Sequence, residues 1–353
     1  MSIIIKNNKK FIIDRTLPEI MKRLEKVDEI DLEKFLMLLE KVGVDLIEVN
    51  KFTLDKIKVL PEKLHYIYRV DDISHIYFLD NYICNFKYVI LDYKKIFSLN
   101  NDTLDKLKGR KIILEVDIKI LDKLIGDSDN KLFSKLNIDF VRIKNVVKYD
   151  LSGWGKMIQQ IKDRFSANVG FCADDKFYMA TAISIEALND DTDFVTAAFN
   201  GEIYGLASLE EVLLGIKVVK QAIVSGDLRY IQELTKIYTQ LTSQKIYCMK
   251  PVIGEDIFKC ESGIHVDGIE KNTHTYEPYN PDDIGSKRTI YIGKHSGKKA
   301  VVLRLNSLNI DCNELDINKF LNKVRETSIR LKRNILDKEL VQIYNDFKDT
   351  CLR

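Results

Sequence analysis

The sequence predicts an α/β protein built as a (β/α)8 barrel, followed by an α-rich C-terminal region. Short, almost continuously apolar runs alternate with amphipathic segments over the first two hundred residues, as expected for buried parallel strands and crossover helices. Eight such runs occur, which is the strand number of this barrel. The main alternative is an open doubly wound sheet, but no G-x-G-x-x-G follows an early run, so the barrel is favoured.

The expected strands follow one another from residue 11 to residue 201. They are FIID (11–14), DLIEV (45–49), HYIYRV (65–70), YVILDY (88–93), KIILEVDI (111–118), IDFVRI (138–143), ANVGFCA (167–173) and DFVTAAFNG (193–201). Segments such as LEKFLMLLEKVG (32–43) and MATAISIEALND (179–190) have the apolar spacing of helices. Each strand with the helix after it is therefore interpreted as one barrel unit.

The pattern changes from about residue 219 onward. Helical segments come first, then a loop region containing glycine and tyrosine, then a charged helical segment near 315–350. We therefore expect a barrel domain at residues 1–225 and a C-terminal lid and subunit-interface region at residues 226–353. The chain has 5 prolines and no Ser- or Gly-rich tract, so no flexible linker is expected.

Composition bounds the class of protein. The 353 residues are 45% hydrophobic, enough for one large core or two smaller ones. Lys and Arg total 55 against 53 acidic residues, with the signs interspersed, so no nucleic-acid partner is indicated. The first residues contain only a three-residue apolar run, too short for a signal peptide or a membrane span. A cytoplasmic protein without a membrane partner is expected. Its 6 cysteines are scattered without a C-x-x-C pair, which argues against a disulfide framework or a zinc knuckle.

Two places carry candidate functional residues. In a barrel the reacting groups follow the strands, which singles out Asp14 and Glu19 after the first strand, Glu48 at the second and Cys172 at the seventh. The second place is the loop-rich stretch 261–297, which contains His265 and Tyr276. Catalytic groups are concentrated on loops over a rigid scaffold, so this stretch is a candidate site as well.

Four segments resemble the homocitrate synthase and 2-isopropylmalate synthase family. PVIGEDIFKCESGIHVDGIEKNTHTYEPYNPDDIG and IYIGKHSGKKAV are similar to its C-terminal region, FIIDRTLPE to its opening motif, and FNGEIYGLASLEEVLLGIK to the segment after its last barrel strand. The resemblance implies condensation of acetyl-CoA with a 2-oxo acid. It also implies a divalent metal, held by an acidic residue of D-x-T-L-R-[DE]-G-E-Q and by two histidines of H-x-H on the seventh strand.

The chain departs from that metal motif at two points. Glu19 matches the acidic ligand, but Pro18 stands where the family has a substrate-binding arginine, and proline offers neither its charge nor its donors. The H-x-H segment is aligned with Phe171-Cys172-Ala173. With two of three ligands missing, Glu19 is interpreted as a vestigial ligand, and metal affinity is expected to be weak or nil.

His265 and Tyr276, by contrast, match positions that the family uses as an acid/base pair in a region that crosses the dimer interface. The resemblance therefore implies an omega-type subunit of a split homocitrate synthase of the nitrogen-fixation type. It would donate these residues to a homologous, metal-competent subunit, which would hold the divalent metal and condense acetyl-CoA with 2-oxoglutarate into homocitrate for nitrogenase cofactor biosynthesis. Autonomous activity is not expected.

Alternatives stay open at this point. The chain could be a non-catalytic regulatory or scaffold pseudoenzyme, a relative with 2-isopropylmalate or citramalate synthase activity, or a synthase active alone with another metal geometry. Several residues also have plain structural interpretations. His295 fits a tight turn leading into the helix AVVLRL, Cys172 a small buried apolar residue, and Asp14 a group that orients backbone at the barrel mouth. His65 and His75 fit satisfied structural residues.

Overall fold

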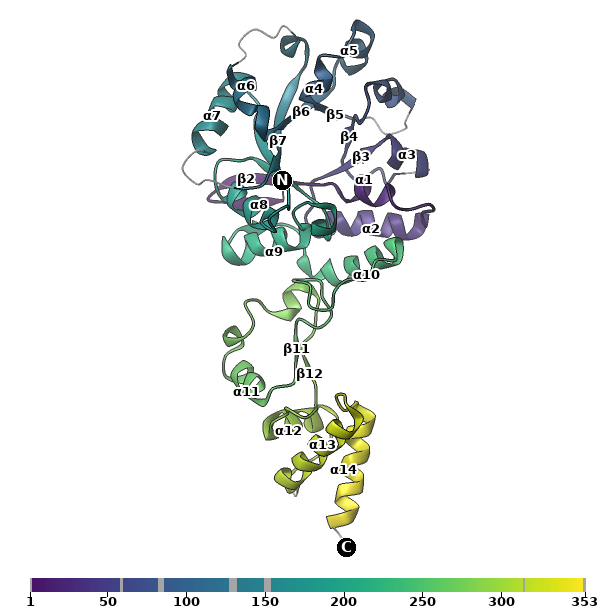
Figure 1. Ribbon diagram of the computed structural model, residues 1–353, viewed down its shortest axis with the longest axis vertical. Helices are drawn as coiled ribbons and strands as arrows, with labels where there is room; N and C mark the ends of the chain where they lie inside the picture. Colours follow the sequence, from purple (N-terminus) through teal and green to yellow (C-terminus); the bar gives the residue numbers. More distant parts are fainter. Residues whose placement is uncertain are drawn as a thin grey trace. The chain divides into compact units, whose positions relative to one another are not determined.

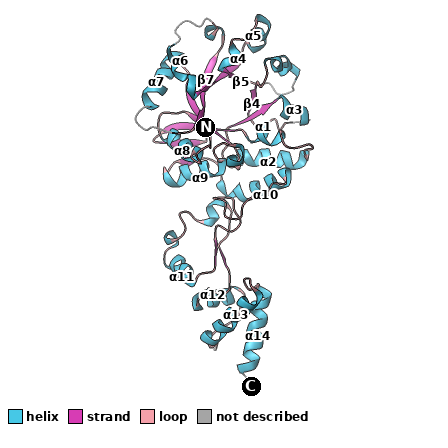
Figure 2. Cartoon of the chain, in the orientation of Figure 1, coloured by secondary structure: helices cyan, strands magenta, loops and turns pink. Residues whose placement is uncertain are grey.

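The computed structural model describes residues 2–57, 60–81, 86–126, 132–148, 154–313 and 315–351. The chain forms two compact units, residues 1–246 and 247–353. Figure 1 colours each unit along the sequence, and Figure 2 distinguishes its helices from its strands. The predicted boundary at residue 225 separates a barrel domain from a region with the role of a lid and subunit interface. This assignment of roles stays a prediction. The compact barrel unit itself extends through α10 (Ile231–Thr242).

Eight parallel strands of the first unit form a closed barrel. The order runs from β2 to β9 without a break, and β9 pairs back with β2 through the register Phe11↔Phe194 to Asp14↔Ala197. The strands are β2 (Asn8–Asp14), β3 (Leu46–Asn50), β4 (Tyr66–Arg69), β5 (Tyr88–Asp92), β6 (Lys111–Asp117), β7 (Ile138–Val146), β8 (Asn168–Ala173) and β9 (Phe194–Ala197). The predicted barrel and all eight predicted strands are confirmed.

Apolar side chains fill the half of the barrel nearer the amino-terminal ends of its strands. The layer consists of Phe11, Ile13, Ile67, Ile90, Ile113, Phe140 and Phe194. The rings of Phe11 and Phe194 stack at 4.9 Å, and that of Phe140 meets Phe11 edge-on at 5.3 Å. Gly170 of β8 makes room for this layer, since a Cβ there would lie 2.4 Å from the Phe194 ring. The barrel is therefore a packed core and not a pore.

Helices surround the strands, as Figure 2 shows. They are α1 (Thr16–Met21), α2 (Glu29–Lys41), α3 (Lys51–Lys56), α4 (Tyr93–Ile96), α5 (Asn101–Leu107), α6 (Leu121–Gly126), α7 (Trp154–Phe165), α8 (Ala180–Asn189) and α9 (Leu209–Val219). Helix α2 begins where the Asp28 carboxylate accepts a hydrogen bond from the Asp31 amide. Its apolar face is buried, and α10 packs against it.

A short antiparallel extension lies at the amino-terminal end of the barrel. Strand β1 (Ile3–Ile5) pairs with the start of β2 on one side and with β10 (Ile223–Val224) on the other. The chain end that precedes the barrel is thereby tied to the segment that follows α9. The functional end of the barrel is the opposite one, where the parallel strands finish.

The second unit is mainly helical. Two short strands, β11 (Lys259–Cys260) and β12 (Thr289–Ile290), pair in parallel and lie before and after the first helix of the unit, and the helices share one apolar core. The helices of this unit are α11 (Gly263–Lys271), α12 (Lys298–Ser307), α13 (Ile317–Leu331) and α14 (Asp337–Cys351). Its buried core comprises Val266, Ile292, Ala300, Val301, Leu305, Phe320, Leu321, Val324, Ile335 and Leu340. The predicted helical C-terminal region is confirmed.

Two expectations from composition concern the whole chain. In the described ranges, no helix has both the length and the apolar character needed to cross a membrane. Cys172, Cys248, Cys260 and Cys312 carry free thiols. Cys84 lies outside the described residues, as does the side chain of Cys351.

Candidate functional site

Four charged side chains fill the barrel where its strands finish. Glu48 of β3, Arg69 of β4, Glu115 of β6 and Arg142 of β7 are between 0% and 9% exposed. Three of them stand two residues after an apolar residue of the interior layer in the same strand. Because side chains alternate along a strand, these positions also point into the barrel. We call them the buried quartet.

Each guanidinium of the quartet bridges both carboxylates. Arg69 places Nε 2.9 Å from Oε2 of Glu48 and Nη2 2.7 Å from Oε1 of Glu115. Arg142 places Nη2 2.7 Å from the same Glu115 oxygen, and its Nη1 contacts Glu48 and lies 3.1 Å from Oγ1 of Thr196. Two positive charges thus face two negative charges, and the quartet is neutral as a whole.

Ionisation within the quartet depends on this pairing. Burial alone would raise the pKa of Glu48, but the guanidinium groups of Arg142 and Arg69 outweigh it and lower that pKa to about 2. Burial opposes ionisation of Glu115 as well, and Arg69 and Arg142 again hold its pKa well below the usual value. Every member therefore stays charged at neutral pH, and removing one would leave a buried charge without compensation.

A cavity of about 280 Å³ opens above the quartet. Its charged lining includes Arg15, Arg69, Glu115, Lys144 and Asp174. Lys144 lies 3.1 Å from Glu115 Oε2 and contacts a carboxylate oxygen of Asp92 on β5. The cations of the cavity wall are thus already matched by carboxylates of the barrel.

Glu19, the predicted vestigial ligand, is held by cations. Its Oε1 accepts a hydrogen bond from Arg15 Nε at 3.1 Å, and its Oε2 lies 2.8 Å from Lys22 Nζ. The Arg15 Nη1 lies 3.9 Å from the Cys172 sulfur. A guanidinium therefore lies between the carboxylate and the thiol that could otherwise serve as donors to a metal ion.

Strand β8 bears on the motif alignment. The ring of Phe171 packs edge-on against Trp154 of α7, outside the barrel, with centroids 4.8 Å apart. Cys172, Ala173 and Asp174 line the cavity above the quartet. Two ligands spaced as H-x-H must share one face of a strand. Cys172 and Asp174 have this spacing and both line the cavity, whereas Phe171 does not line it, so the structure favours an alignment shifted by one residue.

The donors at this mouth do not match the family's metal site. A thiol and two carboxylates, Glu19 and Asp174, stand where an acid and two imidazoles would be needed. Burial raises the pKa of the Cys172 thiol, although the cations of Arg15 and Arg142 oppose this rise, so the thiolate is disfavoured. Among the described residues, no cluster of three or more His, Cys, Asp or Glu side chains is placed to hold a metal ion. That the chain binds no divalent metal tightly stays a prediction.

Asp14 lies fully buried at the end of β2. Its carboxylate accepts hydrogen bonds from the amide of Thr16 at 3.0 Å and from the Thr16 hydroxyl at 2.6 Å. Burial raises its pKa to about 7, although the hydrogen bonds from Thr16 oppose this shift. The structural interpretation of Asp14, a group that orients the turn after the strand, is confirmed.

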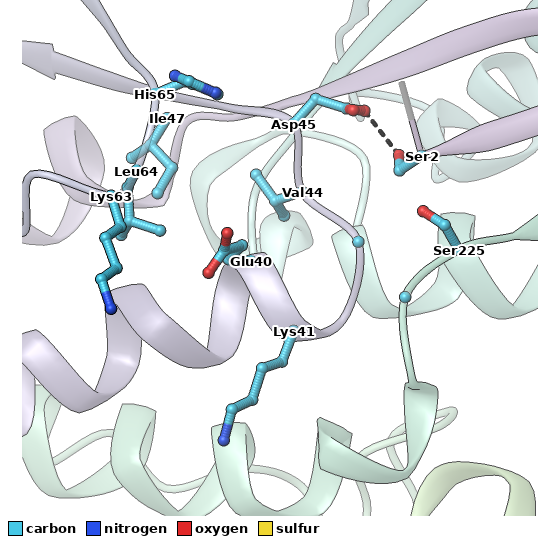
Figure 3. Close-up of a pocket in the computed structure, with 12 residues that line it drawn as sticks. Ser2, Glu40, Lys41, Val44, Asp45, Ile47, Lys63, Leu64, His65 and Ser225 are labelled. Carbon is cyan, nitrogen blue, oxygen red and sulfur yellow. Dashed lines mark hydrogen bonds between the residues drawn. The ribbon is translucent and has the colours of Figure 1, made fainter.

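A second cavity of the barrel unit, about 270 Å³, lies at the opposite end of the strands (Figure 3). It is lined by residues that precede β3 and β4, among them Asp45, which accepts a hydrogen bond from Ser2 Oγ at 2.6 Å. His65 is exposed at its edge, and its interpretation as a satisfied structural residue stays a prediction. The Nδ1 of His75 has no hydrogen-bond partner among the described residues, so the interpretation of His75 as satisfied was wrong. This end of a barrel serves stability.

In the second unit, the structure brings the predicted acid/base residues together. The rings of His265 and Tyr276 lie with centroids 4.5 Å apart and planes tilted by 46°. His265 is on α11, and Tyr276 follows the short turn that returns from the end of this helix. Both side chains are exposed, Tyr276 to 44%. Gly268 makes the contact possible, because a Cβ there would lie 2.4 Å from the Tyr276 ring.

The segment GKHSG forms the turn predicted for it. The His295 amide donates to Glu261 Oε1 at 2.9 Å, and the Gly293 amide donates to the buried Ser296 hydroxyl at 2.9 Å. Arg325 of α13 donates to the Ser296 carbonyl at 2.7 Å. Helix α12 begins directly after this turn. The structural interpretation of His295 is confirmed.

Sequence reasoning had noted Glu48 and missed the other three members of the quartet. Arg69, Glu115 and Arg142 each interrupt an apolar strand in HYIYRV, KIILEVDI and IDFVRI. A charge inside a strand buried on both faces is costly unless it is paired. Two positive charges and one negative charge within buried strands of one barrel were therefore the signal that could have revealed the buried quartet.

Comparisons with known proteins agree with the sequence motifs. Residues 252–332 match the family described as "Homocitrate synthase post-HMGL domain-like". The chain is 45% identical to the homocitrate synthase omega subunit of Clostridium pasteurianum over 356 residues, covering 100% of both chains. It is 34% identical to 2-isopropylmalate synthase 2 of Caldanaerobacter subterraneus subsp. tengcongensis over 193 residues, 54% of this chain and 50% of that protein.

Among solved structures, hydroxymethylglutaryl-CoA lyase from Pseudomonas aeruginosa superposes with a TM-score of 0.51 at 11% identity, over 69% of this chain and 96% of that one. At this identity the likeness concerns the fold alone. The fold therefore places the chain in the class of closed (β/α)8 barrels. The chain belongs to the homocitrate synthase and 2-isopropylmalate synthase family, a family of acyltransferases. The catalytic role of His265 and Tyr276 and the vestigial role of Glu19 stay predictions.

Proposed function

We propose that this chain is the non-autonomous subunit of a split homocitrate synthase. It donates His265 and Tyr276 to the active site of a homologous subunit that holds the divalent metal. The substrates are acetyl-CoA and 2-oxoglutarate, which condense to homocitrate for nitrogenase cofactor biosynthesis. The name of the Clostridium pasteurianum relative, an omega subunit, supports a heteromeric assembly. The proposed partner would carry the intact metal-binding motifs.

One observation carries the proposal, namely the contrast between the two candidate places. At the barrel mouth, Glu19 is neutralised by Arg15 and Lys22 and the core is occupied by the buried quartet. In the second unit, His265 and Tyr276 lie in contact and remain open to solvent. A chain with an occupied barrel and an accessible acid/base pair is suited to complete another chain's site.

The chemistry of the pair suits the proton steps of a condensation. The two nitrogens of an imidazole can donate and accept hydrogen bonds, so the His265 side chain is suited to act as a general acid or base. The Tyr276 hydroxyl can donate a hydrogen bond to an oxygen on which negative charge develops. Because the two rings are in contact, both groups can reach a single bound substrate.

Reconstitution tests the proposal. The chain is mixed with a metal-competent homologous subunit, and acetyl-CoA consumption is measured with 2-oxoglutarate. We expect His265→Ala to lower turnover by about 10²–10⁴-fold, the usual contribution of a general acid or base, and Tyr276→Phe to lower it less. His295→Ala is the matched control, because its side chain lies in the structural turn. Unchanged activity with both His265→Ala and Tyr276→Phe would refute the donation of these residues.

Two alternatives are separated by the same mixture. The neutral quartet also fits a scaffold whose barrel only supports its partner, and in that case the partner needs the chain but not His265. The half-length match to a 2-isopropylmalate synthase supports another 2-oxo acid as substrate. Pyruvate and a branched 2-oxo acid are therefore compared with 2-oxoglutarate. Turnover by the purified chain alone, with stoichiometric metal, would instead indicate an autonomous synthase.

A further inference from the structure

We propose that the ion pair of Glu277 and Arg288 is a positioning device that holds the Tyr276 ring against the His265 imidazole. Its consequence for turnover rests on the proposed function, whereas its effect on the two rings can be measured in the isolated chain. Neither Glu277 nor Arg288 has to touch substrate for this role.

The segment that carries Tyr276 has few restraints of its own. After α11 the Asn272 amide donates to the Gly268 carbonyl at 2.8 Å, and the Tyr276 amide donates to the Thr273 carbonyl at 3.2 Å. Asn272 Oδ1 accepts a hydrogen bond from the His274 amide at 3.1 Å. These bonds fold the turn but leave the Tyr276 side chain exposed. Its ring rests on the bare helix surface at Gly268 and therefore needs a fixed point beyond the turn.

Glu277 provides that fixed point. Its carboxylate is 6% exposed and accepts two hydrogen bonds from Arg288, from Nε to Oε1 at 2.6 Å and from Nη2 to Oε2. A bidentate guanidinium–carboxylate pair fixes direction as well as distance. Since Glu277 follows Tyr276 directly, the pair restrains the backbone of the tyrosine.

Arg288 connects this fixed point back to His265. It directly precedes β12, whose Thr289 and Ile290 pair with Lys259 and Cys260 of β11. Strand β11 in turn leads into α11, which begins at Gly263. The ion pair therefore closes a loop that contains both rings, with Tyr276 next to one end and His265 on the helix at the other.

The geometry can be read directly by NMR. The sequence has 5 histidines, so ¹³Cε1-labelled histidine gives few signals, and His265→Asn assigns the one that matters. Ring currents make this signal sensitive to Tyr276, and Tyr276→Leu supplies its position without the aromatic contact. The test variants are Glu277→Gln, which removes the charge, and Arg288→Lys, which keeps the charge but loses the fork.

A matched control exists in the same unit. Glu339 forms an equally bidentate pair with Arg333, with distances of 2.6 Å and 2.8 Å, far along the sequence from both rings. Glu339→Gln should leave the His265 signal and the turnover of the reconstituted mixture unchanged. Any general effect of losing a guanidinium–carboxylate pair would appear in this variant too.

We expect Glu277→Gln and Arg288→Lys to move the His265 signal toward its position in Tyr276→Leu. In the reconstituted mixture, kcat should fall by about 10- to 100-fold with little change in KM for acetyl-CoA, as for a displaced catalytic group. If Glu277→Gln fails to fold, Arg288→Lys, at a more exposed position, decides. An unmoved His265 signal in a folded variant overturns the proposal. A moved signal combined with an inert His265→Ala would instead show that the positioning is real and the proposed function wrong.

Discussion

Removing Arg142 from the buried quartet should destabilise the barrel strongly and in a pH-dependent way. Arg142→Met keeps most of the volume but leaves Glu48 paired with Arg69 alone and Glu115 with Arg69 and Lys144. Breaking a fully buried ion pair from one side costs about 3–5 kcal/mol. Typical domains are stable by about 5–15 kcal/mol in total, so the loss should be large but measurable.

The sign of the pH dependence follows from Glu48. In the native chain its pKa is lowered to about 2, so the stability it contributes is present above its ordinary pKa of 4.5 and lost as pH falls toward 2. In Arg142→Met, burial should prevail and raise that pKa above the ordinary value. The penalty is then largest near neutral pH and shrinks as acid protonates Glu48.

Trp154 gives the assay. The sequence has 1 tryptophan, and its ring packs on Phe171 of the barrel. Its fluorescence during urea unfolding therefore reports the unfolding of the barrel unit. We expect a midpoint shift corresponding to about 3–5 kcal/mol at neutral pH and a smaller one in mild acid. Arg229→Met, which breaks an exposed bidentate pair with Asp227 in the same unit, should have no resolvable effect. A loss below about 1 kcal/mol, the level of a surface pair, would refute the reasoning.

Three further outcomes are expected. Gly268→Ala should displace the Tyr276 ring, since its Cβ would lie 2.4 Å from it, and so shift the His265 NMR signal and lower turnover in the mixture. Asp14, with its pKa raised to about 7 by burial, binds its proton more readily when folded. Barrel stability should therefore fall as pH rises between about 4 and 7, and Asp14→Asn should flatten this slope in urea titrations. Replacing both Cys172 and Asp174 by histidine should create stoichiometric Co²⁺ binding, visible by absorption, because these positions face the cavity.

Each of these outcomes has its control. For Gly268→Ala, the control is Lys271→Ala on the exposed end of α11, which should leave the His265 NMR signal in place. Asp102→Asn, at an exposed carboxyl group of the same unit, should leave the pH dependence of barrel stability intact. For metal binding, Arg15→Ala is included to free Glu19, and the matched variant places histidines at Phe171 and Ala173. If that variant binds Co²⁺ and the one at Cys172 and Asp174 does not, the assignment of cavity-facing positions in β8 is wrong.

The barrel could be predicted because each strand is buried on both faces and therefore appears as an unbroken apolar run. The motif around His265 and Tyr276 likewise led to two rings that lie in contact in the structure. The facing of β8 could not be obtained from motif letters alone. A shift of one residue exchanges the inward and outward sides of a strand, and only the packing of Phe171 on Trp154 identifies the outward side.

Pairings between distant residues were beyond the reach of the sequence. The residues Arg69, Glu115 and Arg142 lie on three strands and come together only when the sheet closes. Glu277 and Arg288 are joined across an irregular segment that has no periodicity to predict their contact. In both cases the individual residues are unremarkable by type, and their meaning comes from the partner that the fold supplies.

The buried quartet also bears on how such a subunit could change over evolutionary time. Any single substitution among its four charges leaves an unpaired charge in the core and lowers the stability of the barrel. A tolerated change would have to replace several members of the quartet together. We therefore expect these four positions to vary jointly, or not at all, among related subunits.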